Sequence, residues 1–343
     1  MKRIVLLFLA LSALTASAEN ASWLRYPSIS PDGNNVAFSY KGDIYIVDSE
    51  GGEARQLTSN PAYDYSPVWS PDGKTLAFAS DRYGNFDIFT IPVTGGVPFR
   101  VTTHSAKETP WTFTPDGKRL LFTARIQDPA ESAQFPKGTM TELYSVSVNG
   151  GRYEQVLATP AEEVSFIDKG GSFVYQDCKG GENIWRKHHT SSITRDIWMY
   201  DGTRHTKLTS FEGEDRSPRV SADGNTVYFM SERDGSFNIY SFPLNNPDNV
   251  SRVTSHKTHP VRFLTVSDND VLCYGYDGDI YVKRGESASK KLKITVRSDK
   301  NDDNLAELSV SGGGDNDLSA DGKQIAFISR GEVFVASTEY NTV

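Results

Sequence analysis

The sequence predicts an all-β protein, a six-bladed β-propeller built from four-stranded antiparallel blades. Three observations lead to this prediction. A Ser-Pro-Asp-Gly turn recurs along the chain, each copy is followed by short apolar β-type runs, and polar or Gly-Gly turns separate those runs. The copies are spaced by roughly 40 to 54 residues, which is the period of one propeller blade. One such sheet cannot bury both of its faces alone, so the blades must stack around an axis.

The turn itself is justified by its residue types. Pro71 presets φ for the first central position of a type I turn, Asp72 suits the second, and Gly73 can adopt a positive φ. The copies occupy residues 30–33, 70–73 and 114–117, with softer versions at 221–224 and 319–322 and degenerate versions at 167–170 and 267–270.

The runs after each turn give the strands of a blade. In the second repeat they cover residues 75–80, 86–91 and 99–102, with a first run just before the turn. We expect a set of apolar residues to form the layers between blades: Trp69, Phe78, Ile88, Phe113, Phe122, Phe229 and Ile239.

The ends of the chain suggest the domain organisation. Residues 1–18 have a secretory signal pattern, with Lys2 and Arg3, an apolar run over 4–14, and Ala-Ser-Ala at 16–18. Residues 19–298 are predicted to form the propeller, and 299–343 a linker followed by the incomplete first blade of a second propeller. Because residues 291–296 look like the outer strand of blade six, we expect closure without strand exchange. The alternative is one seven-bladed ring in which residues 19–25 complete the last sheet.

Composition limits the partners and the compartment. The net charge of −8 argues against nucleic acid and anionic membranes as partners. With the signal pattern, it suggests a periplasmic or secreted protein. Cys178 and Cys273 fall in repeats that are not neighbours, so two free thiols are expected. No cofactor or metal is expected.

Two stretches carry a family resemblance. The repeats, with Asp-Arg-Tyr-Gly at 81–84 and Arg-Asp-Gly at 233–235, resemble the propellers of TolB and of tricorn-type proteases. The stretch 182–198, with Gly-Glu-Asp-Arg-Ser-Pro at 213–218, is similar to the first propeller of bacterial tricorn protease homologues. The resemblance implies a six-bladed propeller, a second seven-bladed one, a PDZ-like module and a serine-peptidase core. The family's catalytic residues lie in that core, so none is assigned here.

The resemblance therefore implies a non-catalytic propeller of an exported tricorn-like serine protease. It would serve peptide access, product passage or domain assembly, with peptides and the protease domains as partners and a homo-oligomer as a further possibility. Whether this chain belongs to an enzyme stays open. One alternative is a TolB-like periplasmic propeller that binds a peptide or protein. Another is a propeller enzyme such as a polysaccharide lyase, which would need a metal at His256 or His259.

Candidate site residues come from two places. Loops before the innermost strands carry Asp64, Glu108, Asp215, Arg216 and His259, which we expect at the rim of a central channel. They are either a solvated rim or an acidic gate that filters peptides. Arg82, Arg233 and the neighbouring Asp residues, in the turns after the second strands, are interpreted as turn-forming residues and as parts of inter-blade ion pairs.

The insertion in the fourth repeat holds the second group: Arg186, His188, His189 and Arg195. A Ser-His-Asp triad using Ser191 or Ser192 and Asp196 is disfavoured, because no nucleophile-elbow pattern surrounds either serine. We expect this segment to bridge blades or to dock another domain.

Overall fold

The computed structural model describes residues 19–126, 140–181, 185, 186, 188, 190–297, 315–329 and 332–340. All regular elements in these ranges are strands. Among the described residues, therefore, nothing helical has the length and apolarity needed to cross a membrane. The predicted signal peptide, residues 1–18, lies outside the described residues.

Five sheets each contain four strands in sequence order, all antiparallel. Sheet two consists of β6 (Asp64–Trp69), β7 (Thr75–Ser80), β8 (Asp87–Pro92) and β9 (Phe99–Arg100). Sheet three consists of β10 (Thr109–Phe113), β11 (Arg119–Ala124), β12 (Glu142–Ser147) and β13 (Glu154–Leu157). Sheet four consists of β14 (Ala161–Phe166), β15 (Phe173–Asp177), β16 (Ile197–Tyr200) and β17 (His205–Lys207). Sheet five consists of β18 (Asp215–Val220), β19 (Thr226–Ser231), β20 (Asn238–Pro243) and β21 (Ser251–Arg252). Sheet six consists of β22 (Arg262–Val266), β23 (Val271–Tyr276), β24 (Asp279–Arg284) and β25 (Lys290–Lys291).

Sheet one has more strands than the others, because one strand from before the first blade and one from after sheet six both join it. Its four sequential strands are β2 (Arg25–Ile29), β3 (Asn35–Tyr40), β4 (Asp43–Asp48) and β5 (Gly52–Gln56). Strand β26 (Ile294–Val296) pairs with β5 in parallel, and β1 (Glu19–Asn20) pairs with β26 in antiparallel. The expectation that no strand is shared between the ends is therefore wrong. Sheet six takes its outer strand from Lys290–Lys291, which frees the next residues to cross to sheet one.

The recurrent turn forms the same local structure in the five copies that keep Ser or Thr first and Asp-Gly last. The Ser70 hydroxyl donates to Asp72 at 2.6 Å and accepts from the backbone N–H of Thr75 at 3.0 Å. Gly73 has φ 67°, as the turn requires. The copies at residues 30–33, 114–117, 221–224 and 319–322 repeat the hydroxyl–carboxylate bond at 2.5–2.6 Å. The motif thus satisfies its own polar groups, which explains why it marks the fold so reliably.

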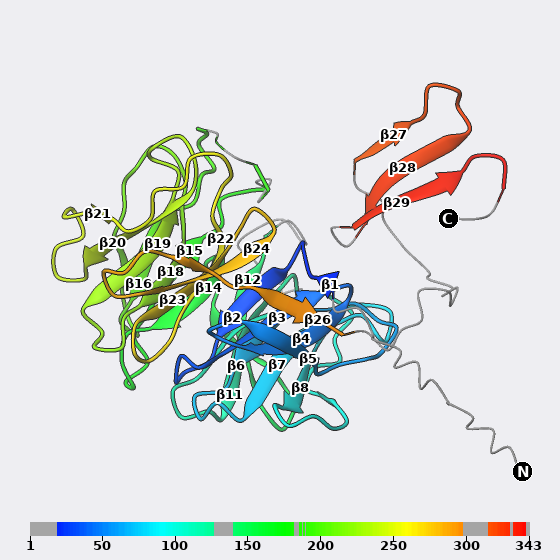
Figure 1. The fold of residues 1–343 in the computed structure, drawn as a ribbon. Coiled ribbons are helices and arrows are strands. Elements are labelled where there is room, and N and C mark those ends of the chain that lie inside the picture. The colour runs from blue at the N-terminus through cyan, green and yellow to red at the C-terminus, as the bar shows by residue number, and fades with distance from the viewer. Residues whose placement is uncertain are drawn as a thin grey trace, which may run out of the picture.

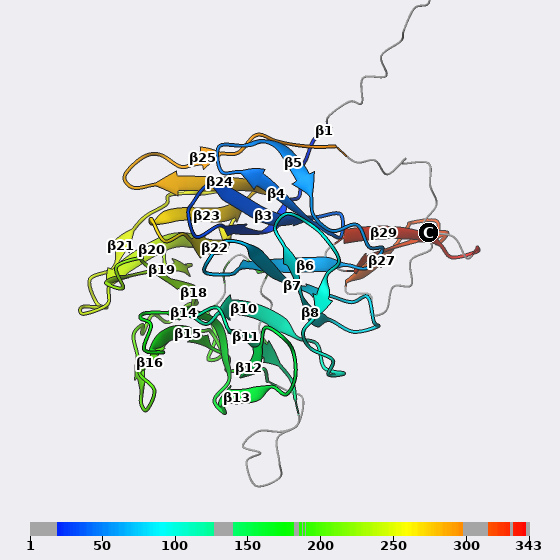
Figure 2. The ribbon, with the colours of Figure 1, turned by 90° about the horizontal axis from the view of Figure 1, so that it is seen from below.

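Figure 2 shows the six sheets arranged around a common centre, with their first strands innermost. Each first strand contacts the next one, and β2 contacts both β6 and β22. The turns also meet from sheet to sheet: the Asp268 N–H donates to the Pro31 carbonyl at 2.8 Å, and the Ala222 N–H donates to Asp270 at 2.9 Å. These contacts join sheet six to sheet one and sheet five to sheet six.

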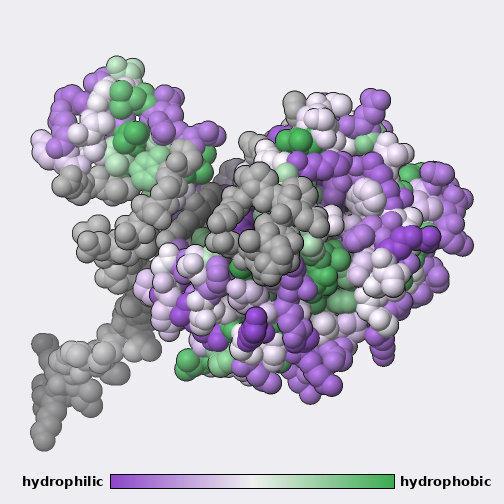
Figure 3. All heavy atoms as spheres, turned by 180° about the vertical axis from the view of Figure 1, so that it is seen from behind, coloured by the Kyte–Doolittle hydropathy of each residue, from purple (hydrophilic) through white to green (hydrophobic). Residues whose placement is uncertain are grey.

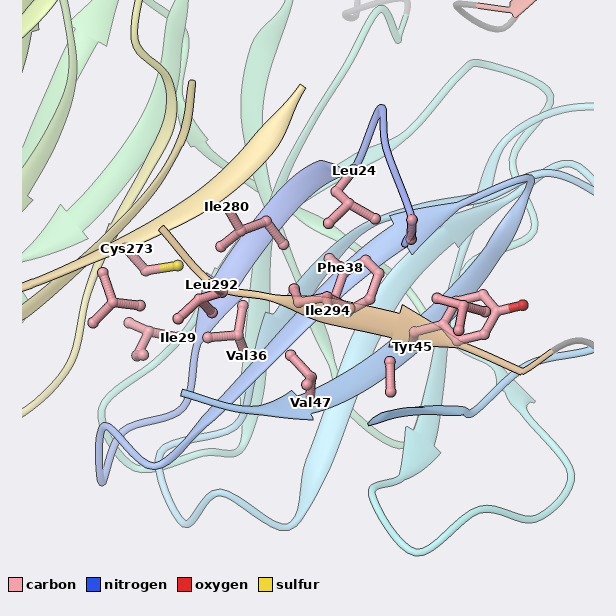
Figure 4. Close-up of a cluster of buried hydrophobic side chains, with 14 of the residues drawn as sticks. Leu24, Ile29, Val36, Phe38, Tyr45, Val47, Cys273, Ile280, Leu292 and Ile294 are labelled. Carbon is pink, nitrogen blue, oxygen red and sulfur yellow. The ribbon is translucent and has the colours of Figure 1, made fainter. Parts of the chain in front are cut away.

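The hydrophobic core lies between neighbouring sheets. Of the apolar residues expected between blades, all are buried except Trp69, which is half-buried and donates its indole N–H to the Ser28 carbonyl at 2.8 Å. Figure 4 shows the cluster that joins sheets one and six. In it, Leu292 and Ile294, from the chain that leads out of sheet six and into β26, lie beside Val36, Phe38 and Val47. The passage of β26 to sheet one therefore buries apolar side chains and also pairs its backbone with that of β5.

An irregularity recurs in the innermost strands. The register shifts after the first or second residue of β2, β6, β10, β14, β18 and β22. At five of these β-bulges a non-glycine residue has a positive φ of 51–58°: Tyr26, Ser66, Glu163, Ser217 and Phe263. Such a φ is uncommon for these residue types, and bulges re-aim side chains. The bulges therefore determine the directions in which side chains of the innermost strands point.

A seventh sheet contains the three strands β27 (Asn316–Leu318), β28 (Gln324–Ser329) and β29 (Glu332–Ser337), coloured red in Figure 1. It repeats the Ser-x-Asp-Gly turn at 319–322. Its apolar side chains Leu318, Ile328, Val333 and Val335 are exposed, and hydrophobic atoms are visible on this sheet at the upper left of Figure 3.

Candidate functional site

The rim carboxylates expected from sequence are buried instead. Asp64 begins β6 and Asp215 begins β18, and neither side chain is accessible. Arg82 binds both carboxylate oxygens of Asp64, and Arg233 binds those of Asp215 in the same way. Each pair lies within one sheet, so the inter-blade interpretation of Arg82 and Arg233 is wrong. The burial also disagrees with a role for these two aspartates in touching peptides at a rim.

Glu108 is fully buried as well, just before β10. The Thr102 hydroxyl donates to one of its carboxylate oxygens, while the other is a buried atom with no hydrogen bond. Burial raises the pKa of Glu108 to about 8, and the nearby Asp87 carboxylate adds to the rise. This side chain therefore holds a proton at neutral pH and does not supply the negative charge of an acidic gate.

Arg216 and Arg195 belong to a buried cluster of charges between sheets four and five. The Arg195 guanidinium lies 3.4 Å from Glu214 and 3.5 Å from Glu162. Arg216 also lies 3.5 Å from Glu214 and packs over the Phe237 ring at 4.3 Å. Burial lowers the pKa of Arg216, whereas Glu162 and Glu214 raise the pKa of Arg195 against the effect of its burial. The cluster fixes these arginines rather than presenting them to solvent.

The fourth-repeat insertion contacts sheet five through Glu232, which follows β19. Arg186 donates to both oxygens of Glu232, at 2.8 and 3.1 Å, and also binds Glu214. His188 lies 3.3 Å from Glu232. His189, the fourth residue of the predicted docking segment, lies outside the described residues.

The same segment reaches sheets six and one. Arg262, the first residue of β22, donates to the carbonyls of Trp185 and Arg186 at 2.8 and 2.7 Å. The Trp185 ring lies 5.9 Å from the Phe263 ring, and the Arg25 guanidinium of β2 lies 5.9 Å from Trp185. Residues 185 and 186 thus connect sheet four with sheets five, six and one; we call this pair the crossing residues.

A pocket of about 300 Å³ lies beside the crossing residues. Its wall combines four aromatic rings, three basic side chains and one carboxylate: Trp23, Trp185, Phe263, Tyr276, Arg25, Arg262, His259 and Asp277. His259, the fifth predicted rim residue, is half-exposed here and lies 3.3 Å from Asp277. It is therefore the one predicted rim residue that opens to solvent, among those the structure describes.

The two histidines considered for a metal have other contacts. His256 stacks on Tyr276 with ring centroids 3.8 Å apart and hydrogen-bonds the Tyr274 hydroxyl at 2.9 Å. Burial lowers its pKa. Within the described ranges, three or more His, Cys, Asp or Glu side chains do not gather in a way that could hold a metal ion.

Sequence reasoning missed Trp23, Trp185 and Arg262. Trp23 lies before the first blade and Trp185 in the insertion, about 160 residues apart, so only the arrangement of sheets brings them to one pocket. Arg262 follows a Pro-Val pair that looks like an ordinary strand start. A signal in the sequence for the two tryptophans was their position outside the predicted strands.

Comparison with known proteins identifies the family. The family model of the tricorn protease N-terminal beta propeller domain matches residues 21–289. The chain belongs to this family. The resemblance expected from the fourth repeat is thereby confirmed.

Curated relatives agree. The tricorn protease of Thermoplasma acidophilum is 26% identical over 90% of this chain and 28% of its own length. A tricorn protease homolog of Saccharolobus solfataricus is 28% identical over 57% of this chain and 18% of its own. The chain thus spans less than a third of the length of these relatives. A TolB homolog of Chlorobium chlorochromatii is 45% identical over 49 residues, 14% of this chain and 11% of its own.

Solved structures support the fold. The crystal structure of the tricorn protease superposes with a TM-score of 0.68 at 23% identity, covering 92% of this chain and 30% of that one. TolB from Acinetobacter baumannii superposes with a TM-score of 0.56 at 18% identity, covering 77% and 61%. At these identities the likeness indicates the propeller fold alone.

Proposed function

We propose that this chain is the non-catalytic, six-bladed propeller portion of an exported tricorn-type serine protease, and that it controls peptide passage at the centre of the blades. The observation that carries the proposal is the position of the crossing residues. Trp185 and Arg186 are held by sheets five, six and one, on the side of the molecule where the loops enter the innermost strands.

Six blades are supported by contacts rather than by repeat counting. The first strands of the six sheets contact one another in cyclic order, and β26 adds a backbone link from the end of sheet six to sheet one. This added strand makes separation of the two ends break backbone hydrogen bonds, which opposes opening of the ring.

The described chemistry favours passage over catalysis. Asp196, the acid of the conceivable triad, binds Lys179 at 2.5 Å and Lys207 at 2.8 Å, while His188 faces Glu232. A triad needs its acid on the histidine. The residues that converge on the insertion are instead arginines, carboxylates and aromatics, which hold a backbone segment in place.

Turnover of peptides of increasing length by the whole natural protein tests the proposal. Glu232→Gln removes the charge that holds Arg186 while keeping an acceptor for the Glu214 N–H, which lies 2.8 Å away. We expect kcat/KM for peptides of about ten residues to change several-fold, with dipeptide substrates unaffected. Glu154→Gln, which breaks the exposed Arg119–Glu154 pair, is the matched control. Equal kinetics of the Glu232 variant and wild type at every length would refute passage past these residues.

Export is part of the proposal. Strand β1 begins at Glu19, directly after the predicted cleavage site at 16–18. Mass spectrometry of the mature protein from the periplasmic fraction should give an N-terminus at Glu19. An intact N-terminus in the cytoplasmic fraction would contradict export.

One observation favours a second candidate, a TolB-like module that binds a peptide or protein partner. The pocket beside the crossing residues is at the lower end of the size range of small-ligand sites and is open to solvent at His259. If the purified natural protein binds peptides but hydrolyses none, this second function replaces the first.

A further inference from the structure

Three junctions between neighbouring sheets are built from the same parts, and one of them lacks a cation. We propose that the junction between sheets two and three is controlled by a proton: it opens locally when Glu108 loses its proton, whereas the equivalent junctions at Asp64 and Asp215 stay closed. We call Asp64, Glu108 and Asp215 the junction carboxylates. Such opening does not depend on whether peptides pass the crossing residues, so it goes beyond the proposed function and is tested separately from it.

The junction carboxylates occupy equivalent places. Each donates its backbone N–H to a carbonyl of the preceding sheet: Asp64 to Gly42 at 2.8 Å, Glu108 to Phe86 at 2.9 Å, and Asp215 to Arg195 at 3.0 Å. Each side chain also accepts a hydrogen bond from a threonine that follows the outer strand of that preceding sheet, namely Thr58, Thr102 and Thr209. Backbone and carboxylate therefore join the same two sheets, beside the innermost strand of the second one.

The threonine at the junction of sheets two and three is held from its own sheet. Its hydroxyl accepts the Ile88 N–H at 2.8 Å and donates its single proton to Glu108. The contact therefore has a fixed direction, and the state of the carboxyl decides how well it fits.

Sheets two and five hold their junction carboxylates with a serine and an arginine from the end of the second strand. Ser80 is the residue paired with Asp64, and Arg82, two positions later, binds both carboxylate oxygens. Sheet five repeats both residue types for Asp215. In these two sheets an ionised carboxylate therefore has a cation and a hydroxyl beside it.

Sheet three lacks both residue types at these positions. Thr109 pairs with Thr123, which brings Ala124 opposite Glu108, and Ile126 follows where the other two sheets have arginine. Neither the Ala124 nor the Ile126 side chain can donate a hydrogen bond, and Ile126 packs against the hydrophobic core between sheets two and three. One oxygen of Glu108 is consequently a buried atom without a hydrogen bond.

The charged groups around Glu108 do not replace the missing arginine. Burial raises the pKa of Glu108 and the Asp87 carboxylate of sheet two adds to the rise, whereas Arg100, which opposes it, is bound to Asp87 at 2.7 Å. In sheet three the Lys107 ammonium lies 5.2 and 5.4 Å from the centres of two aromatic rings of sheet two, and Arg125 acts on Lys107. The proton on Glu108 therefore takes the part that arginine has in sheets two and five.

Loss of that proton leaves a negative charge in the junction with only the Thr102 hydroxyl as a hydrogen-bond donor. A buried charge without a cation is costly, and separation of the two sheets lets water reach it. At alkaline pH the proton passes to solvent and the open state gains. At acidic pH the neutral carboxyl keeps the junction closed.

Hydrogen exchange of the whole natural protein, read by mass spectrometry with fragmentation to single residues, tests the proposal. The quantity compared is the protection factor of each junction carboxylate's amide, which is the exchange rate of an unstructured amide divided by the measured rate at the same pH. Because the pKa of Glu108 is about 8 in the closed junction and 4.5 when exposed, its protection factor should fall by about 30- to 100-fold from pH 6 to pH 8.5. The protection factors of Asp64 and Asp215 should change by less than about threefold.

Glu108→Gln assigns the effect to this carboxyl. The substitution keeps the side-chain length and an oxygen that can accept from Thr102, but it removes the acidic proton. The protection factor at position 108 should then agree within about threefold between the two pH values. Glu154→Gln also removes one carboxylate, but from an exposed pair with Arg119, and should keep the wild-type fall.

A double variant restores the missing parts. Ala124→Ser combined with Ile126→Arg gives sheet three the residue types of sheets two and five. A cation at position 126 would stabilise ionised Glu108, and the fall in its protection factor should shrink to less than about threefold. If the double variant does not fold, Glu108→Gln decides alone.

Each outcome decides the question. A fall confined to the Glu108 amide and removed by Glu108→Gln supports the proposal, whatever the turnover of peptides of increasing length shows. A constant protection factor at Glu108 in the wild type would overturn it. An equal fall at all three junction carboxylates would also overturn it, because the whole ring would then loosen together. A fall that persists in Glu108→Gln would assign the pH dependence to another group and overturn it as well.

Discussion

Arg82 reaches Asp64 with one guanidinium nitrogen 3.0 Å from each carboxylate oxygen, although the two residues are 18 positions apart. Arg233 and Asp215 repeat the arrangement at the same separation in sheet five, with distances of 3.2 Å. In both sheets the aspartate begins the innermost strand and the arginine follows the second strand. Burial raises the pKa of both aspartates, and the arginine of each pair opposes this rise together with a serine hydroxyl, Ser80 beside Asp64 and Ser231 beside Asp215.

Loss of Arg82 should destabilise the protein strongly. Arg82→Ala leaves the inaccessible Asp64 without its cation, and breaking a buried pair in this way costs about 3–5 kcal/mol. Urea denaturation measures the free energy of unfolding. Lys118→Ala, in an exposed pair with Asp116 at 3.8 Å, is the control and should change it by less than about 1 kcal/mol. A loss below about 1 kcal/mol for Arg82→Ala would show that water reaches Asp64.

The free energy of unfolding should decrease as the pH rises from weakly acidic to alkaline values, because of Glu108. Its pKa is raised from 4.5 in the unfolded chain to about 8 in the fold, through burial and the Asp87 carboxylate, and against the opposing effects of Thr102 and Arg100. The native state therefore holds the proton more tightly, and this stabilisation is complete below pH 4.5 and lost as pH rises through about 8.

Glu108→Gln mimics the protonated form at every pH. Its free energy of unfolding should exceed that of wild type by on the order of 2–4 kcal/mol near pH 9, with the difference vanishing near pH 4. Thermal unfolding at both pH values measures this. A difference that does not vary with pH would mean that Glu108 is ionised throughout.

The contribution of the pairing between β26 and sheet one to stability can be measured with a matched pair of glycines. Gly51 and Gly95 occupy corresponding turns and have φ of 96° and 95°. A Cβ on Gly51 would lie 2.8 Å from the Lys293 carbonyl oxygen, whereas one on Gly95 meets nothing within 4 Å. Both alanine variants lose about 1 kcal/mol to backbone strain.

Only Gly51→Ala should also disturb the Gly52 N–H bond to Lys293, which measures 2.8 Å. We expect it to be at least about 1–2 kcal/mol less stable than Gly95→Ala. Hydrogen exchange should show faster exchange of the Gly52 amide in the Gly51 variant alone. Equal losses in the two variants would mean that β26 contributes little to closure.

The elements that sequence predicted are those whose interactions are local. The 70–73 turn is completed by Ser70, Asp72 and Thr75 within six residues, so its pattern is visible without a partner. Strand β26 was misassigned because it has three residues and its partner lies more than 240 positions away. Nothing in Ile-Thr-Val distinguishes an outer strand of sheet six from an added strand on sheet one.

The candidate site was less predictable for a different reason. Asp64 and Glu108 were expected at a rim because they lie in loops just before the innermost strands. Their burial depends on a cation from the same sheet for Asp64 and on protonation for Glu108, and neither is encoded in the loop itself. The register shift at Arg262 and Phe263 likewise depends on pairing with β23.

Trp69 links sheet two to sheet one, and its removal tests the stacking of blades. Trp69→Ala should cost about 3–5 kcal/mol, because it removes a large ring from the interface. Trp69→Phe keeps most of the apolar contact but loses the 2.8 Å bond to the Ser28 carbonyl, and should cost about 1–2 kcal/mol. Urea denaturation again gives both values. A loss below about 1 kcal/mol for the alanine variant would contradict the assigned interface.

Glu232 should control access of proteases to the crossing residues. Its two carboxylate oxygens accept from Arg186 and its side chain is inaccessible, so Glu232→Gln weakens the main contact between this segment and sheet five. Trypsin cleaves after Arg186 only when the segment leaves the surface, and the cleavage rate follows the population of that open state. A loss of about 1.4 kcal/mol in the free energy that holds the segment on the surface would raise the cleavage rate about tenfold.

Mass spectrometry of the fragments identifies the cut, and Glu154→Gln serves as the charge-matched control. Cleavage of the Glu232 variant at the wild-type rate would mean that Glu214, which also binds Arg186, and Arg262, through its bonds to the Trp185 and Arg186 carbonyls, hold the segment without Glu232.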